Sequence, residues 1–257
     1  MPKKVKSKEV KEKKRGVPRI LKVKDESPSE KFDDIHPHLP AMPSLLLMVG
    51  SVRSGKSNYL VNAFCNSDFY KDKFDIVKFI STTLHTDNKG KILSKHFDCM
   101  DHYEDHIIDD IKKSQSQYES KEDRPTYALV MDDVLTKDFS RQNQVSFFST
   151  RFRHYIDFYV IAVQSFRAVS GMIRNNATDL IIFKQQNTKE LEKIAEEYAD
   201  MVGGKDNFLK LYEEAHKERY SFLYLKLSEN PAEAYIRHET KIWPTRDSEE
   251  VEELEIE

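Results

Sequence analysis

The segment GSVRSGKS directly follows an apolar run at residues 45–49 and carries residue types that can bind phosphate. Its spacing fits the pattern G-x-x-x-x-G-K-[ST], in which glycines allow a tight turn whose backbone N–H groups face phosphate oxygens. In this pattern the lysine reaches the β- and γ-phosphates, and the final hydroxyl coordinates Mg²⁺. The segment comprises Gly50, Ser51, Val52, Arg53, Ser54, Gly55, Lys56 and Ser57. We therefore predict a nucleotide-binding loop between a strand and a helix.

Two aspartates follow the apolar run YALVM at residues 127–131, well downstream of the loop. Asp132, at the end of this predicted strand, is placed to hold the metal ion. Asp133 stands one residue further, where a carboxylate can polarise an attacking water as a general base. A turn or a helix cap would also explain such a pair, but the phosphate loop favours the catalytic interpretation.

A further apolar run, FYVIAV at residues 158–163, ends at Gln164 and predicts another strand. A polar residue at the tip of a strand beside the acidic strand can sense the γ-phosphate. Three arginines flank this strand, namely Arg151, Arg153 and Arg174. Each is a candidate arginine finger, a residue that stabilises the transition-state charge in the site of a neighbouring subunit. Each is equally explained as a surface charge or as the partner of a nearby acid.

The elements that must position these residues follow from the alternation of short apolar runs with longer polar stretches. Strands are predicted at residues 45–49, 75–81, 127–131, 158–163 and 180–183, and helices at residues 58–64, 103–118 and 188–201. Continuously apolar strands that alternate with helices indicate a mostly parallel α/β sheet with helices on both faces. Residues 221–227 and 234–237, separated by Glu-Asn-Pro, predict a C-terminal hairpin or a pair of edge strands.

The formal net charge of −3 over 257 residues conceals an uneven distribution. Residues 1–24 carry a net charge of +9, residues 247–257 carry −7, and the remaining body carries −5. We predict a basic, disordered arm and linker at residues 1–40, a nucleotide-hydrolysing domain at residues 41–246, and an acidic tail at residues 247–257. A basic arm suits nucleic acid or an acidic surface, and a merely solubilising tail explains it equally well. No apolar run is long enough to span a membrane, and two cysteines make a reducing compartment the default.

In combination and order, these motifs resemble the poxvirus-type genome-packaging ATPases of large nucleocytoplasmic DNA viruses and virophages, which belong to the FtsK/HerA superfamily. The resemblance rests on GSVRSGKS, YALVMDDV, TRFRHYIDFYVIAVQS and IRNNATDLIIF, and it covers about residues 42–240. Two positions depart from the family pattern. The acid pair is often Asp-Glu, where this chain has Asp132-Asp133, and the residue between the paired arginines is often small, where this chain has Phe152.

The resemblance implies a P-loop NTPase of the RecA/FtsK-like fold that uses ATP and Mg²⁺ to drive viral double-stranded DNA into a preformed capsid. It also implies a homo-oligomeric ring, a contact with the viral capsid or a portal-like vertex, and a location in the host-cell cytoplasm, at the viral factory, in the virion, or in both. Carried over by motif, the residues that bind triphosphate and metal are Gly50, Gly55, Lys56 and Ser57, with Asp132 as a metal ligand. Asp133 is then the candidate base and Gln164 the sensor.

Three other classes of protein can carry such a loop. A small GTPase should carry Asn-Lys-x-Asp after a late strand, but the only Asn-Lys pair, Asn88-Lys89, comes too early. A nucleoside or nucleotide kinase needs an arginine-rich lid, which Arg174 and its neighbours do not form convincingly. A binding protein with a relic loop has no physical need for Lys56, Ser57 and Asp132 together. A kinase, or another P-loop NTPase without DNA translocation, remains the alternative.

Overall fold

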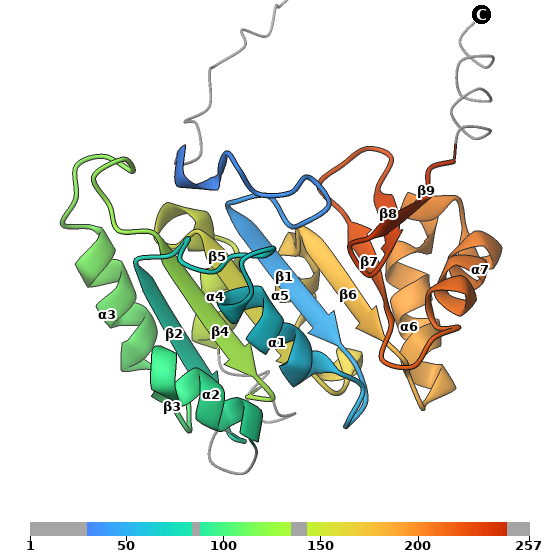
Figure 1. The fold of residues 1–257 in the computed structure, drawn as a ribbon, viewed down its shortest axis with the longest axis horizontal. Helices are drawn as coiled ribbons and strands as arrows, with labels where there is room; N and C mark the ends of the chain where they lie inside the picture. Colours follow the sequence, from blue (N-terminus) through green and yellow to red (C-terminus); the bar gives the residue numbers. More distant parts are fainter. Residues whose placement is uncertain (1–29, 84–87, 135–142, 246–257) are drawn as a thin grey trace, which may run out of the picture.

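A computed structural model describes residues 30–83, 88–134 and 143–245 of the chain (Figure 1). The predicted acidic tail and most of the predicted basic arm, residues 1–29, lie outside the described residues. The described residues form a nine-stranded sheet in the order β3-β2-β4-β5-β1-β6-β7-β8-β9. Its strands are β1 (Ser44–Val49), β2 (Ile76–Ser81), β3 (Asp98–Met100), β4 (Tyr127–Asp132), β5 (Phe158–Val163), β6 (Asp179–Phe183), β7 (Phe222–Lys226), β8 (Glu233–Ile236) and β9 (Thr240–Trp243).

The sheet changes from parallel to antiparallel pairing at β6. The strands from β3 to β6 in the sheet order are parallel, whereas β7, β8 and β9 pair antiparallel with their neighbours. The predicted C-terminal hairpin is therefore present as β7 and β8, and β9 extends it to the sheet edge. Because β1, β4 and β5 run the same way, their carboxyl ends meet at one edge of the sheet, at the bottom of Figure 1.

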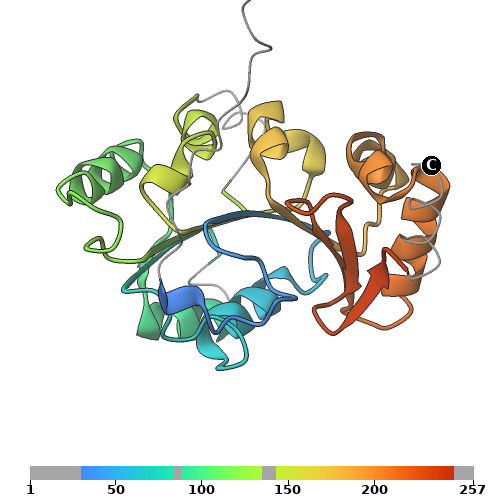
Figure 2. The same ribbon diagram turned by 90° about the horizontal axis from the view of Figure 1, so that it is seen from above.

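Helices cover both faces of the sheet, as Figure 2 shows. One face carries α1 (Lys56–Cys65) and α2 (Asn88–His96), and the other carries α3 (His106–Gln115), α4 (Asn143–Ser149), α5 (Gly171–Asn176), α6 (Thr188–Tyr198) and α7 (Lys205–Ala215). Short 3₁₀ turns also occur among the described residues, namely η1 (Glu30–Phe32), η3 (Phe152–His154), η4 (Phe166–Ala168) and η5 (Ala199–Val202). The predicted α/β class with a mostly parallel sheet is confirmed.

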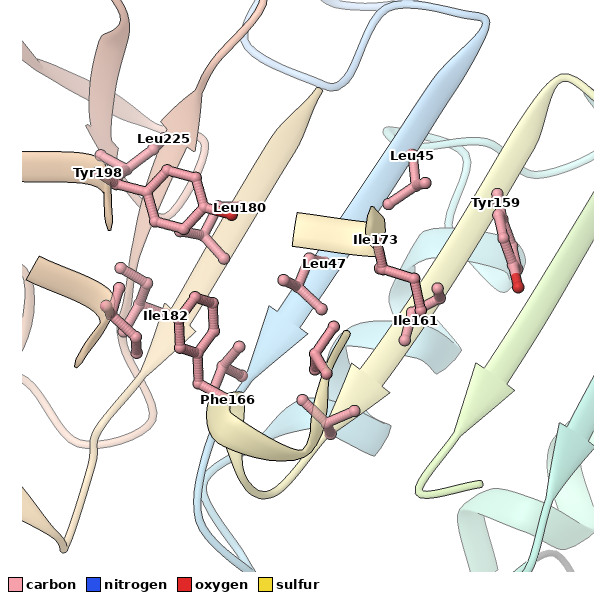
Figure 3. Close-up of a cluster of buried hydrophobic side chains, with 14 of the residues drawn as sticks. Leu45, Leu47, Tyr159, Ile161, Phe166, Ile173, Leu180, Ile182, Tyr198 and Leu225 are labelled. Atoms are coloured by element: carbon pink, nitrogen blue, oxygen red, sulfur yellow. The ribbon is translucent and has the colours of Figure 1, made fainter. Parts of the chain in front are cut away.

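The core consists of two apolar clusters, one on each face, because side chains alternate between the faces along every strand. In β1, Leu45 and Leu47 belong to one cluster, and Leu46 and Met48 belong to the other. All four are fully buried, which explains why the sequence run is apolar without alternation. Figure 3 shows the first cluster, to which α5 contributes Ile173 and β1 contributes Leu45 and Leu47.

The segment of residues 30–40, assigned from the sequence to the linker, packs against the folded body. Phe32 and Leu39 are buried in the second cluster, and the Tyr70 hydroxyl donates a hydrogen bond to the Pro40 carbonyl at 2.9 Å. His38 and His238 bond to each other reciprocally, since each ring Nδ1 lies 2.9 Å from the other residue's carbonyl oxygen. These contacts tie the start of the described chain to the turn between β8 and β9.

No helix among the described residues is both long enough and apolar enough to cross a membrane.

Candidate nucleotide-binding site

The loop of residues 50–57 joins the carboxyl end of β1 to the start of α1 and is tightly folded. A Cβ atom on Gly50 would lie 2.5 Å from Ser54 Oγ and 2.6 Å from Phe183 Cβ, so no side chain fits there. Gly55 immediately precedes α1 with a φ of 120°, a left-handed conformation that favours glycine. The two glycines of the motif are thus required by the geometry of the turn. The loop leads into the N-terminus of a helix, where unpaired backbone N–H groups and the helix dipole favour an anion.

Lys56 is the first residue of α1 and lies inside the loop. Its Nζ donates to the Gly50 carbonyl at 2.6 Å, with the Ser51 carbonyl at 3.4 Å, and only 6% of the residue is exposed. Burial lowers the pKa of this ammonium, while the charges of Asp133 and Asp132 act in the opposite direction. The cation is therefore held at the position where phosphate oxygens could replace the carbonyls as its partners.

Asp132 and Asp133 follow one another but occupy different environments. Asp132 ends β4, pairs in register with Ser81 of β2, and is 5% exposed. Its Oδ2 accepts a hydrogen bond from Ser81 Oγ at 3.2 Å. Asp133 leaves the strand with a φ of 53°, and its backbone N–H donates to the Ala162 carbonyl of β5 at 2.9 Å. Aspartate tolerates this left-handed conformation better than most residues, and the turn directs the chain away from the ladder.

Gln164 lies between the loop and the aspartates because β5 is inserted between β1 and β4. Its Nε2 donates a hydrogen bond to Asp133 Oδ2 at 2.9 Å. At the start of the loop, the Gly50 N–H donates to the Val163 carbonyl at 3.1 Å, one residue before Gln164. The predicted sensor, the predicted base and the phosphate loop are therefore connected through the end of one strand.

The three candidate arginines are not brought to this loop. Arg151 and Arg153 are exposed around η3, just before β5, and thus at the edge of the sheet opposite to the loop. Arg174 lies on α5, where its Nε is 3.1 Å from Glu197 Oε2 and its guanidinium is 5.0 Å from the ring centre of Phe166. Arg174 thus packs in the helical layer, and none of the three lines the groove that contains the loop.

The residues at the loop fit a nucleotide with Mg²⁺. Ser54 Oγ and Asp133 Oδ1 are buried and lack a hydrogen-bond partner in the described part of the chain, as expected where a polar ligand completes the site. No group of three or more His, Cys, Asp or Glu side chains stands ready to hold a metal among the described residues. Mg²⁺ is commonly bound by one or two carboxylates together with substrate phosphates and water. Ser57 and Asp132 are the side chains that could hold it here.

A groove of about 1400 Å³ contains the loop and extends beyond it. Asp133 and Gln164 line it on one side of the loop, and the segment around Tyr220 lines it on the other. The Tyr220 segment was not identified from the sequence, because nothing local marks the residues before β7 as neighbours of a loop formed far earlier in the chain. The described residues form an α/β fold of the P-loop NTPase type.

No protein-family model matches the chain. Among curated proteins, it is 23% identical over 187 residues to the uncharacterized protein 088R of Invertebrate iridescent virus 3, an alignment that spans 71% of this chain and 69% of the relative. This similarity is below the level that would assign a family.

Several solved structures share the fold. The DNA-packaging ATPase B204 of Sulfolobus turreted icosahedral virus aligns with a TM-score of 0.52 at 14% identity, over 75% of this chain and 97% of that chain. EssC (ATPases 2 and 3) of Geobacillus thermodenitrificans aligns with a TM-score of 0.51 at 14% identity, over 82% of this chain and 42% of that chain. The pCW3 conjugation coupling protein TcpA, solved with ATPγS, aligns with a TM-score of 0.50 at 14% identity, over 83% and 65%. At these identities the likeness extends to the fold alone.

Proposed function

We propose that this chain is an Mg²⁺-dependent ATPase whose hydrolysis cycle moves viral double-stranded DNA into a preformed capsid. The observation that carries the proposal is the meeting of Lys56, Asp132, Asp133 and Gln164 at one edge of the sheet. Support for the DNA-packaging role comes from the resemblance of the sequence motifs and from the shared fold of B204, described as a DNA-packaging ATPase. The viral relative supports a viral setting.

In this proposal each residue at the loop has one task. The backbone of residues 50–57 holds the triphosphate, and Lys56 exchanges its carbonyl partners for β- and γ-phosphate oxygens. Ser57 and Asp132 hold Mg²⁺, which neutralises charge on the phosphates when bound. Asp133 takes a proton from the attacking water, and the Gln164 amide fixes the orientation of that carboxylate.

We further propose a homo-oligomeric ring. Arg151 and Arg153 lie at the sheet edge opposite to the loop of their own subunit, so either one acts on a nucleotide only by reaching a neighbour's loop. Both side chains are exposed. A residue that reaches into a neighbouring subunit must be exposed in the isolated chain. The proposed partners are double-stranded DNA and the viral capsid or a portal-like vertex, in the cytoplasmic viral factory, the virion, or both.

The test measures ATP hydrolysis with and without double-stranded DNA while the mass of the particle in solution is recorded. We expect Mg²⁺-dependent hydrolysis that rises when DNA is added, by a particle of several subunits, and no hydrolysis by Lys56→Ala. Full activity of Lys56→Ala would contradict the nucleotide site. A monomer whose hydrolysis ignores DNA would instead favour the kinase-like alternative.

A further inference from the structure

The strand order determines the orientation in which a nucleotide can lie at the phosphate loop. The two aspartates and Gln164 follow β4 and β5, which lie on one side of β1. A γ-phosphate that reacts near Asp133 must point toward that side. The nucleoside at the other end of the phosphate chain must then lie on the opposite side of the loop, toward β6 and β7.

Arg219 and Tyr220 lie on that side, and Ser221 separates them from the start of β7. The Tyr220 carbonyl oxygen would lie 3.8 Å from a Cβ on Gly55, the residue immediately before α1. Both Arg219 and Tyr220 line the groove that contains the loop. The segment before β7 is therefore a direct neighbour of the phosphate loop, although it is distant in sequence.

Tyr220 presents an aromatic ring to this groove. It is 58% exposed and has a φ of 64°, an uncommon conformation for an aromatic residue. The Arg219 guanidinium lies 4.6 Å from the ring centre, on one of the two ring faces. In the described part of the chain no carboxylate forms an ion pair with Arg219, so the arginine is directed to the ring and the groove.

The position of Tyr220 distinguishes it from incidental surface aromatics. Tyr118 and Phe147 are also exposed, but neither lines the groove. An exposed aromatic ring beside a phosphate site is a surface on which a nucleotide base can stack. A cation that packs on the opposite face of the ring strengthens such a platform.

We propose that Tyr220 is the platform on which the base of the bound nucleotide stacks, with Arg219 on the other face of the ring. This inference rests on the proposed function, since it needs a nucleoside triphosphate at the loop. Every base has a π-face that can stack, so the platform should contribute affinity for the nucleotide with little discrimination between bases.

The test separates binding of the base from binding of the phosphates. Affinities are measured by calorimetry for Mg·ATP and for Mg·tripolyphosphate, which offers phosphates without a base. Tyr220→Asn removes the ring while keeping a residue that accepts the left-handed backbone, and Tyr220→Phe keeps the ring without its hydroxyl. Tyr118→Asn is the control, because it makes the same Tyr-to-Asn change at an exposed position outside the groove.

We expect Tyr220→Asn to weaken ATP binding about tenfold, the effect of one base–aromatic contact, and to leave tripolyphosphate binding unchanged. Tyr220→Phe and Tyr118→Asn should bind both ligands as the unchanged protein does. Unaltered ATP affinity in Tyr220→Asn would overturn the inference, and so would an equal loss of both ligands, which would assign Tyr220 to the shape of the loop. If the unchanged protein binds tripolyphosphate but not ATP, or neither ligand, the proposed function fails as well.

Discussion

Gln164 donates a hydrogen bond from Nε2 to Asp133 Oδ2 at 2.9 Å, across the ends of two adjacent parallel strands. The amide holds one oxygen of the carboxylate in place. The other oxygen, Oδ1, is buried and has no hydrogen-bond partner among the described residues, and the side chain borders the groove. The pair thus forms a fixed acceptor beside the phosphate loop, which is the arrangement that a general base for an attacking water needs.

Replacement of Asp133 by Asn should separate nucleotide binding from hydrolysis. The amide preserves the shape of the side chain but accepts no proton, so we expect ATP to bind while the rate of hydrolysis falls about 10²–10⁴-fold. Single-turnover hydrolysis together with ATP affinity measures both effects. Asp132→Asn is the matched variant, and it should instead raise the Mg²⁺ concentration needed for activity. Normal binding and normal turnover in both variants would contradict the assignment of the two acids.

Replacement of Gln164 by Glu should impair hydrolysis more than binding. The new carboxylate would lie within hydrogen-bond distance of Asp133, and two like charges at this separation favour protonation of one of them. We expect the hydrolysis rate at neutral pH to fall at least about tenfold, because the base is then partly protonated or displaced. Gln117→Glu adds the same charge at an exposed position outside the groove and should have no effect. Equal hydrolysis rates for the two variants would show that Gln164 takes no part in hydrolysis.

Replacement of Gly50 by Ala should distort the loop. The added methyl group would lie 2.5 Å from Ser54 Oγ and 2.6 Å from Phe183 Cβ, and the latter atom is fixed to β6. We expect a stability loss of about 1–3 kcal/mol, the usual cost of overpacking, together with weaker ATP binding. Gly171→Ala is the control, because its Cβ would meet nothing closer than 3.7 Å. Thermal unfolding with and without ATP measures both, and an equally stable Gly50→Ala would refute the steric argument.

His238 should make the folded state sensitive to mild acid. Burial lowers the pKa of this imidazole to about 3, and its two nitrogens are engaged by Tyr59 Oη at 3.0 Å and by the His38 carbonyl at 2.9 Å. Below about pH 6.5 the unfolded chain takes up a proton that the folded chain does not, so the free energy of unfolding decreases as the pH falls.

This contribution of His238 amounts to about 1 kcal/mol between pH 7 and pH 5.5. Urea unfolding at the two pH values measures it. The difference should shrink by this amount in His238→Gln and should persist in His96→Gln, a change at an exposed histidine of α2. An unchanged pH dependence in His238→Gln would show that another group is responsible.

The arginines should separate into a structural residue and candidate finger residues. Arg174 is partly buried in an ion pair with Glu197, so we expect Arg174→Ala to lower stability by about 1 kcal/mol. Arg151→Ala and Arg153→Ala should leave the melting temperature unchanged, because both side chains are exposed. Mixing each variant with Lys56→Ala subunits should restore part of the hydrolysis only for the true finger. Restoration by Arg174→Ala, or by none of the three, would contradict a finger near η3.

Local patterns in the sequence were sufficient to predict the phosphate loop, the main strands and the mixed α/β class. A strand buried on both faces must be apolar at successive positions, as in β1 and β5, and the tight loop requires Gly50 and Gly55. Such constraints act within a few residues and are therefore readable from the chain itself. Short elements such as β3 and β9 escaped prediction, because three or four residues carry too little pattern.

The tertiary structure alone decided which of these elements became neighbours. It placed β5 between β1 and β4, and so joined Gln164 to Asp133. It also packed the segment around His38 against His238 and set Tyr220 beside Gly55. These contacts join residues far apart in the chain, and their free energy comes from the packing of the whole sheet and its helices. No local pattern in the sequence records such contacts, so the direction of the nucleotide site became visible only in the folded protein.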